Sequence, residues 1–382
     1  MDSTFIYDRY VTGKDFIGRK QDCVILGNLL TQGENVALWE PPKTGKMSLI
    51  QQTLFNMRMG GQRFVVGELT LLNIRSIEEF VERLGSTVIR TFATTPHEYK
   101  DISSRLLAGT HLVYDPARHS DYDEVLSSSW ELDEGDIKAV LALPFRLAEE
   151  KGQRIFLILD EFQNIMRTED GEKVIKIFEQ VLREQENPQC SFIFSGSMIN
   201  AMKEIFAVKK FFHRQVEHFP LRTVDGKVIV EHIVRGFLSG GKVVDRELLD
   251  GACVLFRNNL CYMNHFASIC DYMSKGYITE PVLVDSLGKL ISIHEPRFKA
   301  TMNDMTTFQL GLLSAILDGH TRFSSAEVIN KYGLNSSANV RRIKDALMKK
   351  EVITFDEKDE PHFEDPLFEY WAGKYFFEKK KK

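Results

Sequence analysis

The sequence lacks the features that mark secreted, zinc-binding and membrane-spanning proteins. Its five cysteines are odd in number and form no CxxC pair, which argues against a disulfide framework and against a zinc site. No apolar run approaches the length that spans a bilayer, and the N-terminal residues MDSTFIYDRY lack the basic and apolar regions of a signal peptide. We therefore expect a soluble, cytoplasmic protein without membrane contact, whose cysteines are reduced.

An excess of positive charge is also missing. The formal net charge is -5 over 382 residues, which argues against a surface that coats nucleic acid in general. The apolar share of 43% and the charged share of 27% are ordinary for globular proteins, so the composition does not indicate disorder. A chain of this length exceeds what one hydrophobic core organises, and we expect two or three structural units.

Short apolar runs alternate with helical patterns in the first part of the chain. The runs lie at 36–39, 64–69, 155–159 and 191–194, and helical patterns lie at 76–92, 136–150 and 171–185. This alternation is typical of β-α units, so we predict an α/β fold with a parallel sheet in a domain spanning 1–225. The acidic stretch near 95–135 is longer than a crossover needs and is predicted to be a partly irregular insertion.

The remaining sequence predicts two further domains. Helical patterns dominate 226–300, where the strand signal fades, and this segment is predicted to be a small helical domain. In 301–382, three short helical patterns precede a pair of strand-like runs, which is the pattern of a winged helix-turn-helix.

The loop 40–48, with the sequence EPPKTGKMS, has the context of a phosphate-binding loop because it follows a predicted strand and precedes a predicted helix. Backbone N–H groups at the helix start can bind an anion, and Lys46 supplies a positive charge for the β- and γ-phosphates. The predicted phosphate contacts are Pro42, Lys43, Thr44, Gly45, Lys46, Met47 and Ser48.

Two positions of this loop depart from the pattern GxxxxGK[ST]. Glu40 replaces the first glycine, and Met47 replaces the hydroxyl residue that normally binds magnesium. A thioether is a poor ligand for this hard cation. Ser48 lies about a hundred degrees further around the helix and does not simply substitute. We therefore predict ATP binding more firmly than hydrolysis.

The run 155–159 ends in two carboxylates, Asp160 and Glu161. In the order loop, then acidic strand, this pair is the expected partner of a phosphate-binding loop. Asp160 would hold Mg²⁺ directly or through water, and Glu161 would orient or deprotonate the attacking water. Ser197 follows the next apolar run and is a candidate ligand of that water or of the γ-phosphate. Arg214 is a candidate arginine finger, acting in cis or from a neighbouring subunit, although a surface arginine is the commoner case.

Taken together, these residues resemble the AAA+ class of P-loop ATPases, and specifically the archaeal-type ATPase family close to the STAND group of nucleotide switches. The resemblance rests on 16–22, PPKTGKMSLI, FLILDEFQNI, FIFSGS, FFHRQ and the terminal YGLNSSANVRRIKDAL through EDPLFEYW. It implies a sheet of order 5-1-4-3-2, a helical lid and a C-terminal winged helix. It also implies base-side contacts from Phe16, Ile17, Gly18 and Arg19. Where relatives carry Gly-Pro-Tyr in the lid, this chain has Asn258 to Tyr262.

The predicted winged helix admits two roles. Arg341, Arg342 and Lys344 make one helix locally basic, and if they face outward they are candidates for DNA contacts. In relatives the winged helix often packs as a switch element, which is the role we favour. The leading hypothesis is an ATP-driven switch with an unidentified protein partner, either monomeric or oligomeric. The alternatives are a DNA-binding regulator and a pseudo-ATPase scaffold, the latter suggested by Glu40 and Met47.

Overall fold

The computed structural model describes residues 4–122, 124–185, 188–356 and 358–378. The chain forms two compact units. The sheet unit consists of 20–40 and 49–221, and the helical unit consists of 1–19, 41–48 and 222–382. Among the described helices, none combines the length and apolar character that crossing a bilayer requires.

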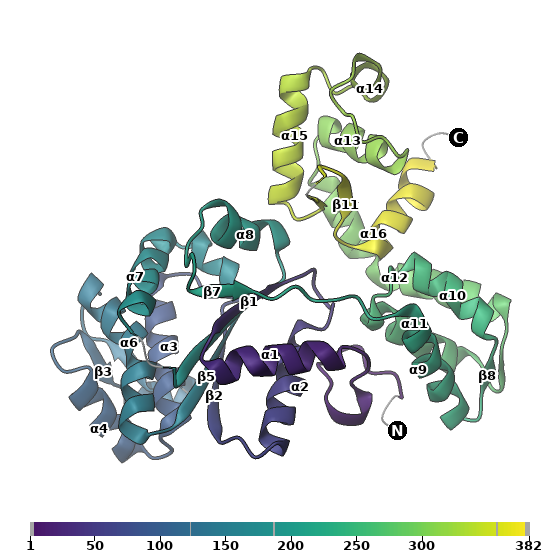
Figure 1. Cartoon of the computed structure of the whole chain (residues 1–382). Helices are drawn as coiled ribbons and strands as arrows, with labels where there is room; N and C mark the ends of the chain where they lie inside the picture. The colour runs from purple at the N-terminus through teal and green to yellow at the C-terminus, as the bar shows by residue number, and fades with distance from the viewer. Residues whose placement is uncertain (1–3, 123, 186–187, 357, 379–382) are drawn as a thin grey trace. The chain divides into compact units, whose positions relative to one another are not determined.

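A five-stranded parallel sheet forms the centre of the sheet unit (Figure 1). Its strands are β1 (Asn35–Trp39), β2 (Phe64–Thr70), β5 (Arg154–Asp160), β6 (Cys190–Gly196) and β7 (Val216–His218). They are ordered β2-β5-β6-β1-β7, and every pair is parallel. Numbered among themselves along the chain, they read 5-1-4-3-2 from the β7 side, which is the order that the resemblance implied. The central strands β5 and β6 are mostly apolar, as is usual for parallel strands that are buried on both faces.

The helices of this unit alternate with its strands along the chain, and some of them begin at side-chain caps. They are α1 (Lys20–Gln32), α2 (Lys46–Met59), α3 (Ile77–Phe92), α6 (Glu134–Lys151), α7 (Gly171–Glu184) and α8 (Ile199–Lys203), with a 3-10 turn at Phe162–Arg167 and a π turn at Glu204–Val208. Ser76 caps α3 by accepting a hydrogen bond from the Glu79 N–H. Asp133 and Asp136 form a capping box at the start of α6. The bounds of α3 and α6 agree with the predicted ranges 76–92 and 136–150 to within two residues.

The insertion near 95–135 is more regular than its composition suggested. It contains α4 (Pro96–Leu106), β3 (Leu112–Tyr114), α5 (Pro116–Tyr122) and β4 (Leu126–Ser128). Two buried polar side chains of α3 hold it: Glu82 accepts hydrogen bonds from the N–H and hydroxyl of Ser128, and Ser86 accepts from the N–H groups of Val125 and Leu126. The insertion is therefore part of the core rather than a loose loop.

The helical unit contains a bundle followed by a winged helix. The bundle has α9 (Gly226–Ser239), α10 (Arg246–Leu255), α11 (Leu260–Met273) and α12 (Glu280–Asn303), with the short strands β8 (Val243–Val244) and β9 (Tyr277–Ile278) and a 3-10 turn at Gly13–Asp15. The N-terminal Phe5 is buried against Phe237 of α9, at 4.8 Å between ring centroids. The N-terminal segment thus belongs to this bundle's core.

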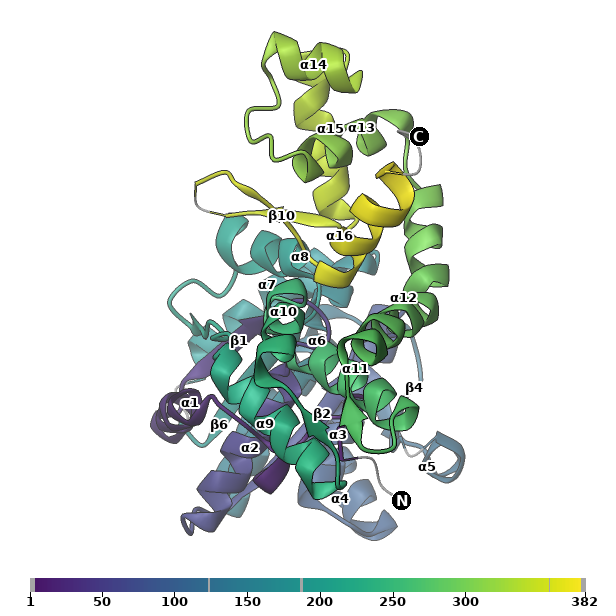
Figure 2. The same ribbon diagram turned by 90° about the vertical axis from the view of Figure 1, so that its right-hand side faces the viewer.

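The winged helix has the predicted elements. They are α13 (Thr307–Leu317), α14 (Ala326–Tyr332), α15 (Ser337–Lys349), the hairpin β10 (Ile353–Phe355) and β11 (Pro361–Phe363), and α16 (Pro366–Trp371), which ends in a π turn at Ala372–Phe377. Ser336 caps α15, as predicted. Figure 2 shows α12 running continuously from the bundle towards α13. The boundary expected at 300–301 therefore falls inside one helix.

Candidate functional site

The loop between β1 and α2 has an unusual backbone. Lys43 has φ 65° and Gly45 has φ 93°, so the chain turns through left-handed conformations just before α2 begins at Lys46. Glycine adopts this region without strain. A Cβ on Gly45 would also lie 2.9 Å from Nη1 of Arg19. A left-handed turn leading into a helix N-terminus is the backbone arrangement that binds phosphate groups.

Two side chains of the loop converge on one carbonyl oxygen. The Lys46 ammonium donates to the Pro41 carbonyl at 3.0 Å, and the Thr44 hydroxyl donates to the same oxygen at 2.8 Å. Lys46 is only 7% exposed. The Lys46 ammonium here donates to a neutral carbonyl oxygen. A hydrogen bond from an ammonium to an anion is stronger than one to a neutral carbonyl, so an anion can replace the carbonyl as its acceptor.

Arg19 holds the loop from outside. Its Nη1 donates to the Thr44 carbonyl and its Nε to the Arg222 carbonyl, both at 2.8 Å. The guanidinium is thus engaged by two backbone oxygens, and its geometry is that of a loop clamp. The resemblance implied that Arg19 contacts the base. In the structure its guanidinium contacts the phosphate-binding loop.

Glu40 and Met47 are the two positions where the loop departs from the usual pattern, and the contacts around them are as follows. Glu40 still donates its N–H to the Gly196 carbonyl at 3.4 Å, so the chain keeps pairing with β6 one residue beyond β1. The hydroxyl oxygen of Ser48 accepts a hydrogen bond from the Val11 N–H at 3.1 Å. Ser48 is therefore engaged with the N-terminal segment, and Met47 contributes only a thioether where magnesium-binding loops have a hydroxyl.

Asp160 and Glu161 lie at the carboxyl edge of the sheet. Glu161 has φ 55°, and its Oε2 accepts three hydrogen bonds: from the Gln163 side-chain amide at 2.5 Å, the Ser197 hydroxyl at 2.7 Å and the Ser197 N–H at 3.4 Å. The structure thus brings together Glu161 and Ser197, two residues that the sequence placed in one site. Gln163 was missed. Its signal was a polar residue two positions after Glu161, and it is 2% exposed.

A second carboxylate approaches Asp160. Glu68 of β2 accepts a hydrogen bond from the Gln51 side chain at 3.0 Å. Partial burial, followed by the negative charge of Asp160, raises the pKa of Glu68. Sequence reasoning missed Glu68 because a single acidic residue in an edge strand reads as an ordinary surface position. This end of β2 is consequently acidic on one face, which suits a divalent cation.

Arg214 lies near the amino ends of the parallel strands, at the opposite end of the sheet from Glu161. It precedes β7, whose Val216 pairs with Asn35 at the amino end of β1. Glu161 follows the carboxyl end of β5, which runs parallel to these strands. The structure therefore does not bring Arg214 and Glu161 together, so a role in cis does not follow from the sheet. Arg214 is exposed, and its backbone is left-handed with φ 62°.

The bundle and the winged helix share a polar junction. The Tyr262 hydroxyl of α11 donates to Asp365 at 2.9 Å, and Arg297 of α12 donates to the same carboxylate at 2.6 Å. Arg257 donates to the Phe363 carbonyl of β11 at 2.8 Å. Burial, with the adjacent Asp365 charge, raises the pKa of Tyr262, so its hydroxyl remains a donor at neutral pH. These hydrogen bonds connect the winged helix to the bundle.

The basic face of α15 is smaller than predicted. Arg341 and Arg342 are exposed, but Lys344 is half-buried. The ammonium of Lys344 donates to Asp359 at 2.9 Å and lies 3.9 Å from the ring centroid of Phe355. Lys344 therefore packs across the hairpin, and only Arg341 and Arg342 of the three candidates meet the condition of facing outward.

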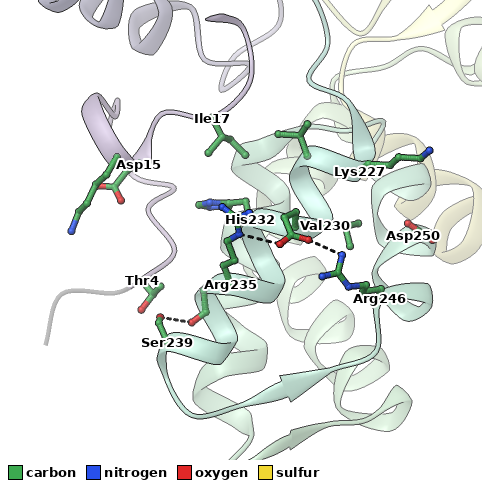
Figure 3. Close-up of a pocket in the computed structure, with 14 residues that line it drawn as sticks. Thr4, Asp15, Ile17, Lys227, Val230, His232, Arg235, Ser239, Arg246 and Asp250 are labelled. Atoms are coloured by element: carbon green, nitrogen blue, oxygen red, sulfur yellow. Dashed lines mark hydrogen bonds and ion pairs between the residues drawn. The ribbon is translucent and has the colours of Figure 1, made fainter.

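A hollow of about 860 Å³ lies between the N-terminal segment and helices α9 and α10 (Figure 3). Ile17 lines it, whereas Phe16 and Gly18 are half-buried and are not among its lining residues. Glu231, another lining residue, forms ion pairs with Arg235 at 3.0 Å and with Arg246 at 2.6 Å. Such charged lining differs from the mostly apolar walls that enclose nucleotide bases.

Comparisons with known proteins agree with this architecture. A family model described as a probable winged helix domain matches residues 296–374. The Walker-type ATPase PABY2304 of Pyrococcus abyssi has a TM-score of 0.67 at 15% identity, over 96% of this chain and 99% of that one. The ORC2 protein of Aeropyrum pernix, in ADPNP-ADP complexes, has a TM-score of 0.57 at 12% identity, over 100% and 99%. Its ADP form has a TM-score of 0.53 at 12% identity, over 94% and 93%. No curated protein matches the chain. At these identities the likeness concerns the fold.

Proposed function

We propose that this chain, which has the fold of an AAA+-type P-loop ATPase with a C-terminal winged helix, binds ATP and magnesium and acts as a nucleotide-dependent switch. The observation that carries the proposal is the loop after β1. There, Lys46 and Thr44 converge on the Pro41 carbonyl at a helix N-terminus. In ATP-bound protein, phosphate oxygens replace that carbonyl as the partner of Lys46, and the N–H groups of 44–46 face the phosphates.

Turnover is proposed to be slow. Asp160 is the proposed magnesium residue, acting through water, and Glu161 is the proposed general base. Two features hold the rate down: Met47 offers magnesium no hydroxyl, and Glu161 is engaged by Ser197 and Gln163. Since Arg214 lies at the far edge of the sheet, we assign it to a neighbouring copy in an oligomer.

The switch is proposed to act through the lid and winged helix together. Asp365 links them by hydrogen bonds from Tyr262 and Arg297, and α12 runs through both. A nucleotide-driven change in the lid would therefore carry the winged helix with it and change the surface presented to a protein partner.

DNA binding is the second reading. It rests on exposed Arg341 and Arg342 alone, since Lys344 is engaged with Asp359. The hairpin also carries exposed Asp356 and Asp359 near its tip, which weakens its attraction for phosphates. We therefore rank the protein switch above the DNA regulator.

The test measures ATP binding through Trp39, which immediately precedes the loop and stacks on His218 with ring centroids 3.7 Å apart. Titration of the protein with ATP and magnesium should change its fluorescence saturably. Lys46→Ala should weaken binding by about 10- to 100-fold, since a charge-assisted hydrogen bond contributes roughly 1.5–3 kcal/mol. The control is Lys100→Ala on exposed α4. Absence of ATP binding in the wild type, checked by calorimetry, would favour the scaffold alternative. A salt-dependent shift of duplex DNA without ATP binding would favour the regulator.

A further inference from the structure

Strand β2 forms an edge of the sheet with no common protective feature. It pairs with β5, and among the described residues no strand lies on its other side. Its sequence FVVGELT contains neither proline nor lysine, two residues that often blunt an edge strand. An exposed strand edge presents N–H and C=O groups that can pair with another extended segment.

A hollow of about 430 Å³ follows this edge. Five consecutive residues of β2, 64–68, line it. Because alternate residues of a strand point to opposite faces, only a hollow that runs along the backbone edge is lined by all five. At about 3.3 Å per residue the lined edge is roughly 17 Å long, which matches a five-residue strand.

Two helices wall this hollow from opposite faces of β2. On one face, Gln51 and Arg58 of α2 contact the alternate residues Glu68 and Phe64, the guanidinium of Arg58 lying 5.0 Å from the ring centroid of Phe64. On the other face α3 lies so close to Gly67 that a Cβ there would stand 3.0 Å from the Thr91 hydroxyl. The edge therefore lies at the bottom of a preformed trough.

The charge of the trough selects its occupant. Arg58 and Arg90, both exposed, line it together with the single acid Glu68. We propose that β2 receives an extended, acidic segment of a partner protein as an added strand. Backbone hydrogen bonds to β2 supply affinity, and carboxylates facing Arg58 and Arg90 supply selectivity.

The test uses a fluorescein-labelled eight-residue peptide of alternating valine and glutamate, followed by fluorescence anisotropy at low salt. We expect saturable binding to the full chain. The double variant Arg58→Glu, Arg90→Glu should weaken it by at least about tenfold. Arg183→Glu, which changes an exposed arginine of α7, is the control and should bind the peptide as the wild type does. Circular dichroism melting curves that match the wild type show that the variants fold.

Two further peptides separate the backbone and charge contributions. The same peptide N-methylated at alternate amides should lose binding, because it cannot form a strand ladder. A peptide with lysine in place of glutamate should also lose binding. Equal binding of either peptide overturns the proposal. Sedimentation that detects a dimer of the wild type, but monomers of the Arg58→Glu, Arg90→Glu variant, would assign the edge to a second copy of this chain and also overturn it. None of these outcomes depends on ATP binding.

Discussion

The carboxyl edge of the sheet and the loop after β1 differ in how fully they retain the groups that ATP hydrolysis uses. At the edge, Glu161 and Ser197 are hydrogen-bonded to each other, and Glu161 directly follows Asp160, the last residue of β5. In the loop, Lys46 is placed to meet phosphate, but Met47 supplies no hydroxyl and Ser48 accepts from Val11. In the proposed function, the carboxyl edge carries the groups that act on water and magnesium, whereas the loop carries the group that binds phosphate. Under the proposed function, this difference predicts that ATP binding and ATP turnover can be changed separately by substitution.

Removing the proposed base should have the largest effect. Glu161→Gln keeps the side-chain shape but cannot accept a proton, and general base catalysis typically contributes 10²–10⁴-fold. We expect phosphate release to fall by roughly this factor, with ATP affinity changed by less than about threefold. Phosphate release and Trp39 fluorescence measure the two quantities. Glu169→Gln, an exposed acid beyond the same turn, is the control. Unchanged phosphate release in Glu161→Gln would remove Glu161 from the mechanism.

Restoring the loop hydroxyl should have a smaller, opposite effect. Met47→Thr offers magnesium an oxygen ligand where the wild type has sulfur. We expect turnover to rise by about tenfold, which corresponds to about 1.4 kcal/mol of transition-state stabilisation. The steady-state rate across a magnesium titration measures it. Met59→Thr, on the exposed end of the same helix, is the matched control. If Met47→Thr turns over no faster, the missing hydroxyl does not limit the rate, and the hydrogen bonds on Glu161 become the leading cause.

Much of the fold could be predicted because apolar runs and helical periodicity report burial directly. The continuous apolar run of β5 predicted a central strand, and it is fully buried from Ile155 to Leu159. The insertion was harder. Its order depends on Glu82 and Ser86, two polar residues of α3 that satisfy backbone groups some forty positions away. No local pattern reveals such a contact, since only the folded chain brings these segments together.

The candidate site shows the same contrast between residues that local patterns predict and contacts that only the folded chain creates. Lys46, Asp160 and Glu161 were predicted from motifs, whose residue spacing follows from local geometry. The hydrogen bond from Gln163 to Glu161 depends on a left-handed turn at Glu161 that a sequence does not announce. The partners of Lys344 also depend on the fold. Lys344 follows two exposed arginines closely in the sequence, but the hairpin after α15 folds back and supplies Asp359 and Phe355 as its partners.

The smallest expected effect concerns Lys43, the loop's exposed lysine, and the histidines of the lid. Burial lowers the pKa of His265, and Lys43 lowers it further. Burial also lowers the pKa of His294 to about 4, followed by the charges of Arg297 and Lys43. The unfolded chain therefore binds more protons than the folded one between about pH 6.5 and pH 4, and stability falls as the pH is lowered through this window.

Replacing Lys43 with glutamine removes one of the charges that oppose protonation. Lys43→Gln should raise the pKa of His294 by less than about one pH unit and reduce the loss of stability on acidification. NMR titration of the histidine ring protons measures the first effect, and urea unfolding at pH 7.5 and pH 5 measures the second. Lys14→Gln, on the exposed turn before Phe16, is the control. If both histidine pKa values stay unchanged in Lys43→Gln, the loop's charge does not reach the lid.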